Sequence, residues 1–396
     1  MFSRHSNLVV PKRTSVVNFP TTMSPPSTAV VYDQHGPPDT VTRSILDSQC
    51  PSTTTPTIMF SRHSYLVIPT QTSVVNFPAT MSPPSTAVVY DQHGPPDTVT
   101  RVTKIPPVEM NENEVCVKML AAPINPADIN RIEGVYPVLP PIPAIGGWEG
   151  VGEIHSVGSA VMALSPGDLV IHAAYLSDKN TPIEYAATIS VNPLSALRML
   201  EDFVALKSGD TIVQNGATSI VGQCVIQLAR IRGIHSINII RDKPESDKIK
   251  EKLIKLGANK VFTESELEVK GVKNLLGDIP KPSLGLNCIG GNAANMVVKF
   301  LKQGGTMVTY GGMSKKPITI STPYFIFKDI SLKGYLLQEK NLDEAQYRCS
   351  IDHLLALVRA GILQYEMEMV PFKDFHVTLE KAMGKQGSQR KQILKF

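Results

Sequence analysis

Apolar and polar positions follow two different patterns along the chain, and the change falls near residue 195. From there on, short continuous apolar runs alternate with segments whose apolar residues recur at helical spacing. The pattern predicts strands at 210–215, 235–241, 260–262, 284–291 and 305–312, and helices at 196–206, 220–233, 246–257 and 295–303. Continuous apolar strands are typical of parallel sheets buried on both faces, so this stretch predicts a doubly wound α/β domain.

The preceding region, residues 87–171, has the pattern of short strands. Strands are predicted within 114–125, 150–158 and 167–174, with glycine and proline between them and a turn at Gly94, Pro95 and Pro96. Near the C-terminus a helix is predicted at 343–363 and a strand at 391–396. We therefore expect a leader at 1–84, a mainly-β domain at 85–194, the α/β domain inserted at 195–335, and a return to the mainly-β domain at 336–396.

The N-terminal part contains a near-exact duplication. Residues 1–43 recur as residues 59–101, and a Ser/Thr/Pro-rich linker at 44–57 separates the two copies. Only the second copy continues into the predicted strands, so the first is interpreted as a redundant leader with low order before about residue 85. The first 32 residues contain Arg4, Lys12 and Arg13 and no acidic residue, which predicts a mitochondrial transit peptide ahead of a plastid one. The alternative is a tail of chance composition.

Composition excludes several classes of protein. The net charge is +4 and the basic residues are scattered, so neither a nucleic-acid-binding stripe nor a polybasic membrane patch is indicated. No apolar run is long enough to predict a membrane-spanning helix. The cysteines lie far apart without a CxxC pair, which argues against a disulfide framework and a structural zinc site and is typical of a reducing compartment. They are Cys50, Cys116, Cys224, Cys288 and Cys349.

A cofactor site is predicted where the first strand of the α/β domain ends. The strand at 210–215 runs into a loop with Gly216 and Gly222 and then into a helix. The first backbone N–H groups of a helix lack internal partners, and the helix dipole favours an anion there, so this turn can hold a pyrophosphate.

The next predicted strand ends at Arg241, 19 residues after Gly222. An acid in this region usually binds the ribose 2′-hydroxyl of NAD, whereas an arginine accommodates the 2′-phosphate of NADP. Arg241 and Lys243 therefore favour NADPH, while Asp242 between them leaves the NAD role open. Glycines in the segment 305–313 would let a ligand approach the backbone at the same edge.

Seven segments together resemble a known family. They are VKMLAAPINPADIN, GVYPVLPPIPAIGGWEGVGEI, VNPLSALRML, IVQNGATSIVGQ, INIIRDKP, LNCIGG and GGTMVTYGGMSKKP. In this order they resemble the mitochondrial enoyl-[acyl-carrier-protein] reductases, also called trans-2-enoyl-CoA reductases, and the plant members most. This is a zinc-free branch of the medium-chain dehydrogenase/reductase superfamily. The resemblance implies a Rossmann-type sheet inserted into a GroES-like catalytic domain.

The resemblance also implies an activity and its setting. Such enzymes use NADPH to reduce the trans-2 double bond of enoyl thioesters carried by acyl-carrier protein or coenzyme A, in fatty-acid synthesis in the mitochondrial matrix. They are soluble and typically homodimers. No nucleic acid and no membrane insertion are expected.

Site residues follow from the matching motifs. The catalytic tyrosine of the family falls on Tyr136. The cofactor-binding positions fall on Asn215, Arg241, Asp242, Lys243, Pro244, Tyr310, Gly311, Gly312, Met313, Tyr335, Leu336, Leu337, Gln338 and Lys391. Hydride addition to an enoyl thioester creates an enolate, beside which a phenol can donate a hydrogen bond and then a proton. No metal is expected, because Cys116, His155 and His172 have no partners at zinc-ligand spacing.

The chain departs from the family pattern in two places. Only seven residues separate Ala174 from Pro182, where family members have a longer stretch that contributes to the catalytic wall. Leu336 stands where the family has tryptophan, and the single tryptophan, Trp148, lies where relatives have other residues. Two alternatives therefore stay open: a zinc-free quinone or enone reductase, and a catalytically impaired NADPH-binding variant.

Overall fold

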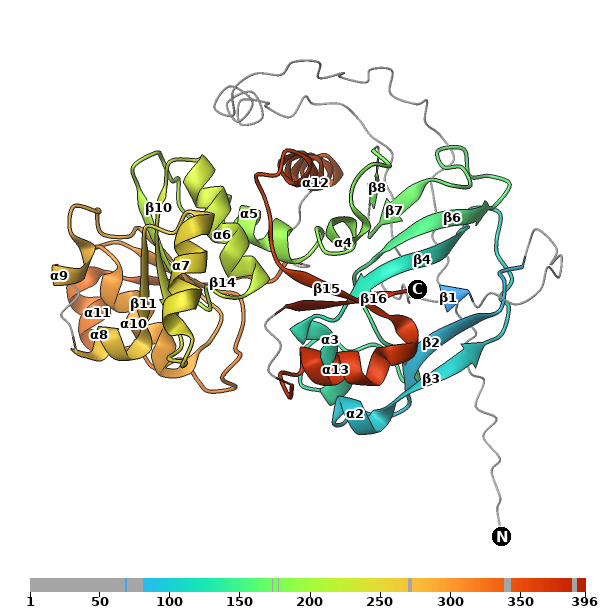
Figure 1. Cartoon of the computed structure of the whole chain (residues 1–396), viewed down its shortest axis with the longest axis horizontal. Coiled ribbons are helices and arrows are strands. Elements are labelled where there is room, and N and C mark those ends of the chain that lie inside the picture. Colours follow the sequence, from blue (N-terminus) through green and yellow to red (C-terminus); the bar gives the residue numbers. More distant parts are fainter. Residues whose placement is uncertain are drawn as a thin grey trace, which may run out of the picture. The chain divides into compact units, whose positions relative to one another are not determined.

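The computed structural model in Figure 1 describes residues 68–69, 81–172, 174–176, 178–269, 273–337, 343–386 and 390–396. These residues form two compact units. The first contains the described residues of Thr54–Ala187 together with Met367–Phe396, and the second contains Thr188–Glu366. The domain boundaries predicted from the sequence stay predictions.

The second unit is built on a six-stranded parallel sheet. Its strands are β9 (Thr211–Asn215), β10 (His235–Ile240), β11 (Lys260–Thr263), β12 (Leu284–Asn287), β13 (Thr306–Thr309) and β14 (Ser331–Gly334). Their order in the sheet is β11-β10-β9-β12-β13-β14. Counted along the chain within this unit, this is the order 3-2-1-4-5-6 of dinucleotide-binding folds. The doubly wound parallel sheet predicted from the alternation is confirmed.

Helices cover both faces of this sheet (Figure 1). They are α6 (Ile220–Ile231), α7 (Ser246–Leu256), α8 (Glu264–Val269), α9 (Lys273–Leu276), α10 (Gly291–Phe300) and α11 (Thr322–Lys328). Of the remaining helices of the unit, α5 (Asn192–Glu201) packs against α6, and α12 (Glu344–Arg359) packs against α5. Alternate residues of β10 belong to two separate cores. Ile237 and Ile239 pack with residues of α10, and Ile240 packs with residues of α6 and α7. Burial on both faces explains why the successive residues Ile239 and Ile240 are both apolar.

The first unit is mainly β. One sheet has the order β15-β16-β4-β6-β7-β8, and β4 pairs antiparallel with both β16 and β6. These strands are β4 (Val115–Pro123), β6 (Val151–Val157), β7 (Leu169–Ile171), β8 (Ala174–Tyr175), β15 (Met367–Pro371) and β16 (Lys391–Lys395). The second sheet contains β1 (Ile68–Pro69), β2 (Ser85–Tyr90), β3 (Thr100–Ile105) and β5 (Ala144–Ile145). The C-terminal strand thus returns to the sheet of the N-terminal half, as predicted.

Short helical elements complete the first unit. They are α2 (Pro96–Val99), α3 (Pro126–Glu133), α4 (Ile183–Ala186), the 3₁₀ turn η2 (Phe372–Asp374) and α13 (Phe375–Ala382). The expected turn at 94–96 runs into α2. Helix α3 begins within the segment predicted as strand and loop, because Asn125 and Asp128 form a capping box and Pro126 occupies the first turn.

The predicted leader lies mostly outside the described residues, as does Cys50. The exceptions are Ile68–Pro69, which pair with β2, and residues 81–84, where Met81 bridges to Glu109. Within the described residues, no helix combines the length and the apolar character needed to cross a bilayer.

Candidate functional site

The turn after β9 contains two glycines that pack too closely against the rest of the chain to carry a side chain. Gly216 has a φ of +64°, and a Cβ on it would lie 2.4 Å from the Cys288 Sγ. A Cβ on Gly222 would lie 2.6 Å from the Cα of Ala217. Ser219 caps α6, and its Oγ accepts a hydrogen bond from the Gly222 N–H at 3.1 Å. Both positions therefore require glycine, because neither has room for a Cβ. The amides at the start of α6 are those that can hold a pyrophosphate.

The Asn215 side chain is hydrogen-bonded within the sheet, and its predicted contact with a cofactor stays a prediction. Asn215 is buried, its Nδ2 donates to the Asn287 Oδ1 at 2.7 Å, and its Oδ1 accepts from the Cys288 N–H at 2.8 Å. The side chain therefore joins β9 to β12 across the sheet. The Asn287 Oδ1 also accepts from the Gly290 N–H at 3.1 Å, so the same network fixes the loop after β12.

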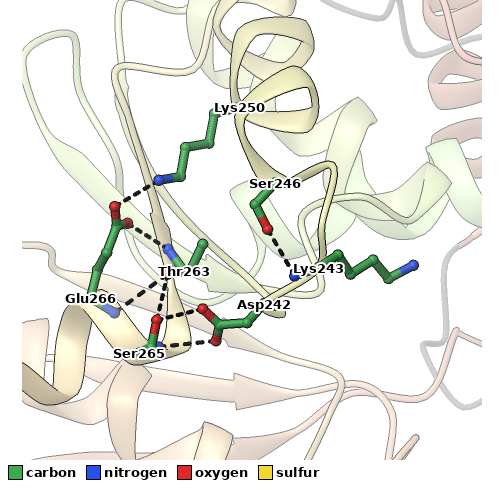
Figure 2. A network of polar contacts seen from close by, with 7 residues as sticks. All are labelled: Asp242, Lys243, Ser246, Lys250, Thr263, Ser265 and Glu266. Carbon is green, nitrogen blue, oxygen red and sulfur yellow. Dashed lines mark hydrogen bonds and ion pairs between the residues drawn. The ribbon is translucent and has the colours of Figure 1, made fainter.

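The loop after β10 carries the residues predicted to discriminate between cofactors, and Figure 2 shows two of them, Asp242 and Lys243. The Asp242 carboxylate accepts hydrogen bonds from the Ser265 Oγ at 2.5 Å and from the Ser265 N–H at 3.1 Å. The side-chain hydrogen bond lowers the pKa of Asp242, so it stays ionised. Within the described residues, no hydrogen bond or ion pair engages the side chain of Arg241, which is exposed.

Lys243 and Pro244 continue this loop into α7. The Lys243 N–H donates to the Ser246 Oγ at 2.9 Å, which fixes the start of the helix. The Lys243 side chain points away from the Asp242 network in Figure 2. Pro244 is exposed. The loop therefore presents two cations, Arg241 and Lys243, while the one acid between them is bound to α8.

The end of β13 adds a second stretch of accessible backbone. Gly311 lies close to the loop after β12, since a Cβ on it would be 3.2 Å from the Cys288 carbonyl oxygen, whereas Gly312 is exposed with open space around it. The Met313 side chain is exposed. Tyr310 differs from these, because its hydroxyl is buried and burial raises its pKa well above the ordinary value.

The segment after β14 contributes mainly packing. The Tyr335 ring is buried and meets the Phe203 ring edge-on at 6.0 Å, and burial raises the pKa of Tyr335. Leu336 and Leu337 are half-buried. Gln338 lies outside the described residues. For these residues a role in cofactor binding stays a prediction.

Tyr136 lies in the first unit, two residues after Gly134 ends α3 with a φ of +79°. It is half-buried in a loop whose apolar residues are exposed, among them Val135 at 63% and Val138 at 49%. The Arg131 guanidinium lies 4.9 Å from the centre of the Tyr136 ring and 3.3 Å from the centre of the Trp148 ring. Cations over aromatic faces at such distances are attracted by the ring quadrupole.

Arg131 is a buried cation of the described region whose Nε and Nη1 have no hydrogen-bond partner. Burial lowers the pKa of Arg131, and the nearby Asp128 opposes this effect. Burial also raises the pKa of Asp128, which lies one turn earlier on α3. The Tyr136 and Trp148 rings therefore stabilise the buried Arg131 charge in part, as a carboxylate does in a salt bridge.

Lys391 anchors a buried polar cluster on the same unit. Its Nζ donates to the Ile124 carbonyl oxygen at 2.9 Å and to the Asn125 Oδ1, and the Asn125 Nδ2 donates to the Glu149 Oε2 at 2.8 Å. Burial lowers the pKa of Lys391 to about 8, against the attraction of Glu149 and Asp128. In this arrangement the ammonium group joins β16 to the start of α3, and its predicted contact with a cofactor stays a prediction.

The segment between Ala174 and Pro182, which we call the short join, follows β7 closely, and the edge strand that it enters, β8, is only two residues long. β8 consists of Ala174–Tyr175 and pairs with Val170 and Ile171, and the Leu176 N–H then donates to the Leu169 carbonyl oxygen at 2.7 Å. Among the described residues, no group of three or more His, Cys, Asp or Glu side chains is placed to hold a metal ion. The absence of a metal requirement stays a prediction.

Comparison with known proteins identifies the family. Residues 111–191 match the family model described as alcohol dehydrogenase GroES-like domain, and residues 221–356 match the one described as zinc-binding dehydrogenase. The mitochondrial enoyl-[acyl-carrier-protein] reductase of Arabidopsis thaliana is 60% identical over 342 residues, covering 82% of this chain and 91% of the relative. The chain belongs to the mitochondrial enoyl-[acyl-carrier-protein] reductase family. The resemblance inferred from its motifs is confirmed.

Other members of the reductase family are more distant. The human mitochondrial enoyl-[acyl-carrier-protein] reductase is 42% identical over 328 residues, covering 78% of this chain and 88% of the relative. Among solved structures, the mitochondrial 2-enoyl thioester reductase Etr1p/Etr2p heterodimer of Candida tropicalis is 31% identical with a TM-score of 0.72, covering 78% of this chain and 99% of the other. The Escherichia coli quinone oxidoreductase complexed with NADPH is 21% identical with a TM-score of 0.69, covering 78% of this chain and 100% of the other. At this identity the likeness shows the fold alone.

The match with the A. thaliana reductase also bears on the short join. The alignment runs over 342 residues, whereas 82% of the 396 residues of this chain is about 325. At about 17 of the aligned positions, the difference between these two lengths, this chain therefore has no residue opposite the relative. A shortened segment between Ala174 and Pro182 agrees with this difference.

Two residues of the site escaped prediction from the sequence. Ser265 lies 23 residues after Asp242, and nothing in the pattern of either segment indicates that they meet. Arg131 is a single charge on a short helix, which the sequence equally allows to be exposed. Its position three residues after the acid of a capping box is the one signal that places it on the same helix face as Asp128.

Proposed function

We propose that this chain catalyses the NADPH-dependent reduction of the trans-2 double bond of enoyl thioesters, giving acyl thioesters. The observation that carries the proposal is the 60% identity to an enoyl-[acyl-carrier-protein] reductase in a chain that retains both the Tyr136 loop and the Arg241–Lys243 loop. The Etr1p–NADP–crotonyl-CoA complex, which is 31% identical with a TM-score of 0.72, supports the cofactor and the thioester class.

The cofactor fits the residues of the second unit. The backbone amides at the start of α6, after the N-cap Ser219, are the groups that would hold the pyrophosphate. Arg241 and Lys243 are the groups that would hold the 2′-phosphate, since a guanidinium can bind phosphate oxygens in bidentate fashion. Asp242 is bound to Ser265, so its carboxylate is not directed to a ribose hydroxyl.

The chemistry assigned to the chain's own residues is a proton transfer. Reduction adds a hydride, which NADPH supplies when bound, to Cβ of the enoyl thioester and moves the π electrons onto the thioester oxygen. The Tyr136 hydroxyl donates a proton to Cα, which completes the acyl thioester and leaves a phenolate that regains a proton from solvent. Arg131 beside the Tyr136 ring stabilises negative charge on that phenol.

A direct assay tests the proposal. The purified chain is incubated with NADPH and crotonyl-CoA, and the acyl product is identified by mass spectrometry while NADPH consumption is followed. Turnover with crotonyl-CoA that exceeds turnover with quinones and simple enones supports the proposal. Preference for a quinone would replace it with the quinone reductase alternative, which the fold alone does not separate from it.

The two-residue β8 favours a second candidate, a catalytically impaired member of the family. Such a protein would be stabilised by NADPH, by mass action on the folded state, without turnover. Thermal unfolding with and without NADPH, beside the turnover assay, separates the two. A variant in which the corresponding longer segment of the A. thaliana relative replaces residues 175–181 should then gain turnover, whereas a fully active natural chain should not.

The partners we propose are an enoyl thioester on acyl-carrier protein or coenzyme A and a second copy of the chain. Support for a homodimer comes from β14, which forms an edge of the parallel sheet with exposed side chains, and from exposed Ile326 and Phe327 on α11. An edge strand with unpaired backbone groups beside apolar side chains is suited to pairing with another chain. Light scattering of the wild type and of Phe327→Glu, with the mass of a dimer expected only for the wild type, tests it.

We place the protein in the mitochondrial matrix. The proposal is supported by the names of the relatives, which are mitochondrial enzymes, and by the basic first 32 residues without an acid. Fusions of a fluorescent protein to residues 1–84 and to residues 59–84 test both the location and the need for the duplicated leader. Cytosolic fluorescence of both fusions would overturn the assignment.

A further inference from the structure

Asp242 occupies the position at which an acid would select NADH, yet it is bonded elsewhere. Asp242 is the second residue after β10, directly after Arg241. Its carboxylate accepts hydrogen bonds from the Ser265 Oγ at 2.5 Å and from the Ser265 N–H at 3.1 Å. Both bonds come from the first turn of α8, on the neighbouring strand-helix connection (Figure 2). One oxygen accepts from each donor, so both carboxylate oxygens are engaged.

The donor residue belongs to a network at the start of α8, since the Ser265 Oγ also lies 3.2 Å from the Thr263 Oγ1 (Figure 2). The Thr263 N–H donates to the Glu266 Oε2 at 2.9 Å, and the Glu266 N–H donates to the Thr263 Oγ1 at 3.4 Å, which is the reciprocal pair of a capping box. The Lys250 ammonium on α7 forms an ion pair with the Glu266 Oε1 at 2.7 Å. The capping box and the ion pair thus fix the start of α8, which carries Ser265, and Ser265 in turn binds the Asp242 carboxylate.

We propose that Ser265 determines cofactor specificity by binding the Asp242 carboxylate to α8, which leaves Arg241 and Lys243 as the groups that meet the 2′ position of the cofactor. The inference rests on the proposed use of NADPH. It explains how a chain with an acid at this place can favour a phosphorylated cofactor.

Release of Asp242 would affect the two cofactors in opposite directions. A free carboxylate can accept hydrogen bonds from the 2′-hydroxyl of NADH, as acids at this place do. The same carboxylate repels the 2′-phosphate of NADPH, and at about 4 Å in water such a repulsion corresponds to about a fivefold change in an equilibrium constant. The ratio of the two dissociation constants is therefore more sensitive than either constant alone.

The test is a titration of the apo-protein with NADPH and with NADH by isothermal calorimetry, which does not depend on turnover. Ser265→Ala removes the hydroxyl donor and leaves the Asp242 carboxylate with the longer hydrogen bond from the residue 265 N–H alone, whereas Ser265→Thr keeps both donors as the matched control. We expect Ser265→Ala to lower the preference for NADPH by about fivefold to tenfold, with Ser265→Thr close to the wild type. An unchanged ratio in a Ser265→Ala protein with the wild-type Tm would overturn the inference.

A double-mutant cycle with Asp242→Asn shows whether the effect passes through the carboxylate. In the Asp242→Asn background, Ser265→Ala should change the NADPH/NADH ratio by less than about twofold, because no charge is left to release. An equal effect in both backgrounds would mean that Ser265 acts through the shape of α8 and would overturn the inference. If the wild type itself binds NADH as tightly as NADPH, the proposed cofactor fails, and this inference falls with it.

Discussion

The cofactor edge of the second unit and the Tyr136 loop of the first are held by different kinds of interaction. At the cofactor edge, hydrogen bonds between Asn215 and Asn287 and steric requirements at Gly216 fix the backbone. At the Tyr136 loop, a guanidinium lies against two aromatic rings with two N–H groups that lack partners. The proposed cofactor edge is thus held by backbone geometry, whereas the proposed catalytic phenol lies against a stacked, buried charge.

This difference has consequences for substitution. Backbone geometry tolerates few changes, because a Cβ at Gly216 meets the Cys288 sulfur at 2.4 Å. A stacked cation can be exchanged for a side chain of similar shape, and the fold persists because no hydrogen bond is broken. Stability and activity are therefore expected to respond in different proportions in the two regions.

The largest expected effect is that of Tyr136→Phe. Removing the hydroxyl removes the proton donor, so kcat with crotonyl-CoA should fall by about 10²–10⁴-fold. The dissociation constant for NADPH should stay within about twofold, since the assigned cofactor residues are untouched. Stopped-flow and steady-state kinetics beside an NADPH titration measure both quantities. A kcat within threefold of the wild type would remove Tyr136 from the chemistry.

The next largest is Gly216→Ala, which tests the steric requirement of the cofactor edge. The added Cβ meets the Cys288 Sγ at 2.4 Å in a backbone with a φ of +64°, so the free energy of unfolding should fall by roughly 2–4 kcal/mol. Gly209→Ala is the matched control, because Gly209 has a φ of +89° with nothing within 4 Å of a Cβ. Urea unfolding of both variants separates the steric cost from the backbone cost. Equal losses would show that the contact with Cys288 is unimportant.

A smaller and opposed pair of effects is expected for Arg131→Met. Loss of the charge beside Tyr136 should lower kcat by about threefold to tenfold, the size of a partly buried cation–π interaction. The free energy of unfolding should stay level or rise by about 1 kcal/mol, because an apolar side chain replaces a buried cation with unpaired donors. Arg131→Lys keeps the charge and should retain more of kcat. A loss of stability that parallels the loss of activity would show that Arg131 serves the fold instead.

A further prediction concerns Lys391 and pH. Its pKa in the folded state is about 8, below its ordinary value of 10.5, so between these values the unfolded state binds more protons than the folded state. The contribution of Lys391 to the free energy of unfolding therefore increases as pH rises from about 8 towards 10.5, by at most about 1.4 kcal/mol per pH unit. Urea unfolding at several pH values should give a steeper rise for the wild type than for Lys391→Met. Parallel curves would show that the ammonium is solvated.

The parallel sheet could be predicted because its signals are local and repeated. The strand at 210–215 and the helix at 220–233 each carry an uninterrupted periodic pattern, and their order along the chain follows from the pattern alone. Strand β14, with exposed side chains throughout, and α11, which has no buried residue, carry no such pattern and were missed. The C-terminal β15 and α13 were also missed, since half-buried β15 alternates weakly.

For the site, the sequence supplied residue types but not their partners. The motif at 136–143 indicates where a catalytic phenol lies, and the position of Arg241 after a strand indicates a phosphate site. The engagement of Asp242 by Ser265 depends on two strand ends meeting in the sheet, which is a property of the tertiary structure. The stack of Arg131 on Trp148 likewise joins residues 17 positions apart through packing, not through periodicity.

The stack of Arg131 on Trp148 also gives the protein an intrinsic optical signal. Trp148 is the single tryptophan of the 396 residues, and its ring lies 3.3 Å from a cation that also lies over the Tyr136 ring. Indole emission depends on nearby charge, so the tryptophan fluorescence of the whole chain comes from the surroundings of the Tyr136 loop. If the proposed thioester substrate binds beside that loop, its binding should change this emission without a label, separately from the nicotinamide fluorescence of the cofactor.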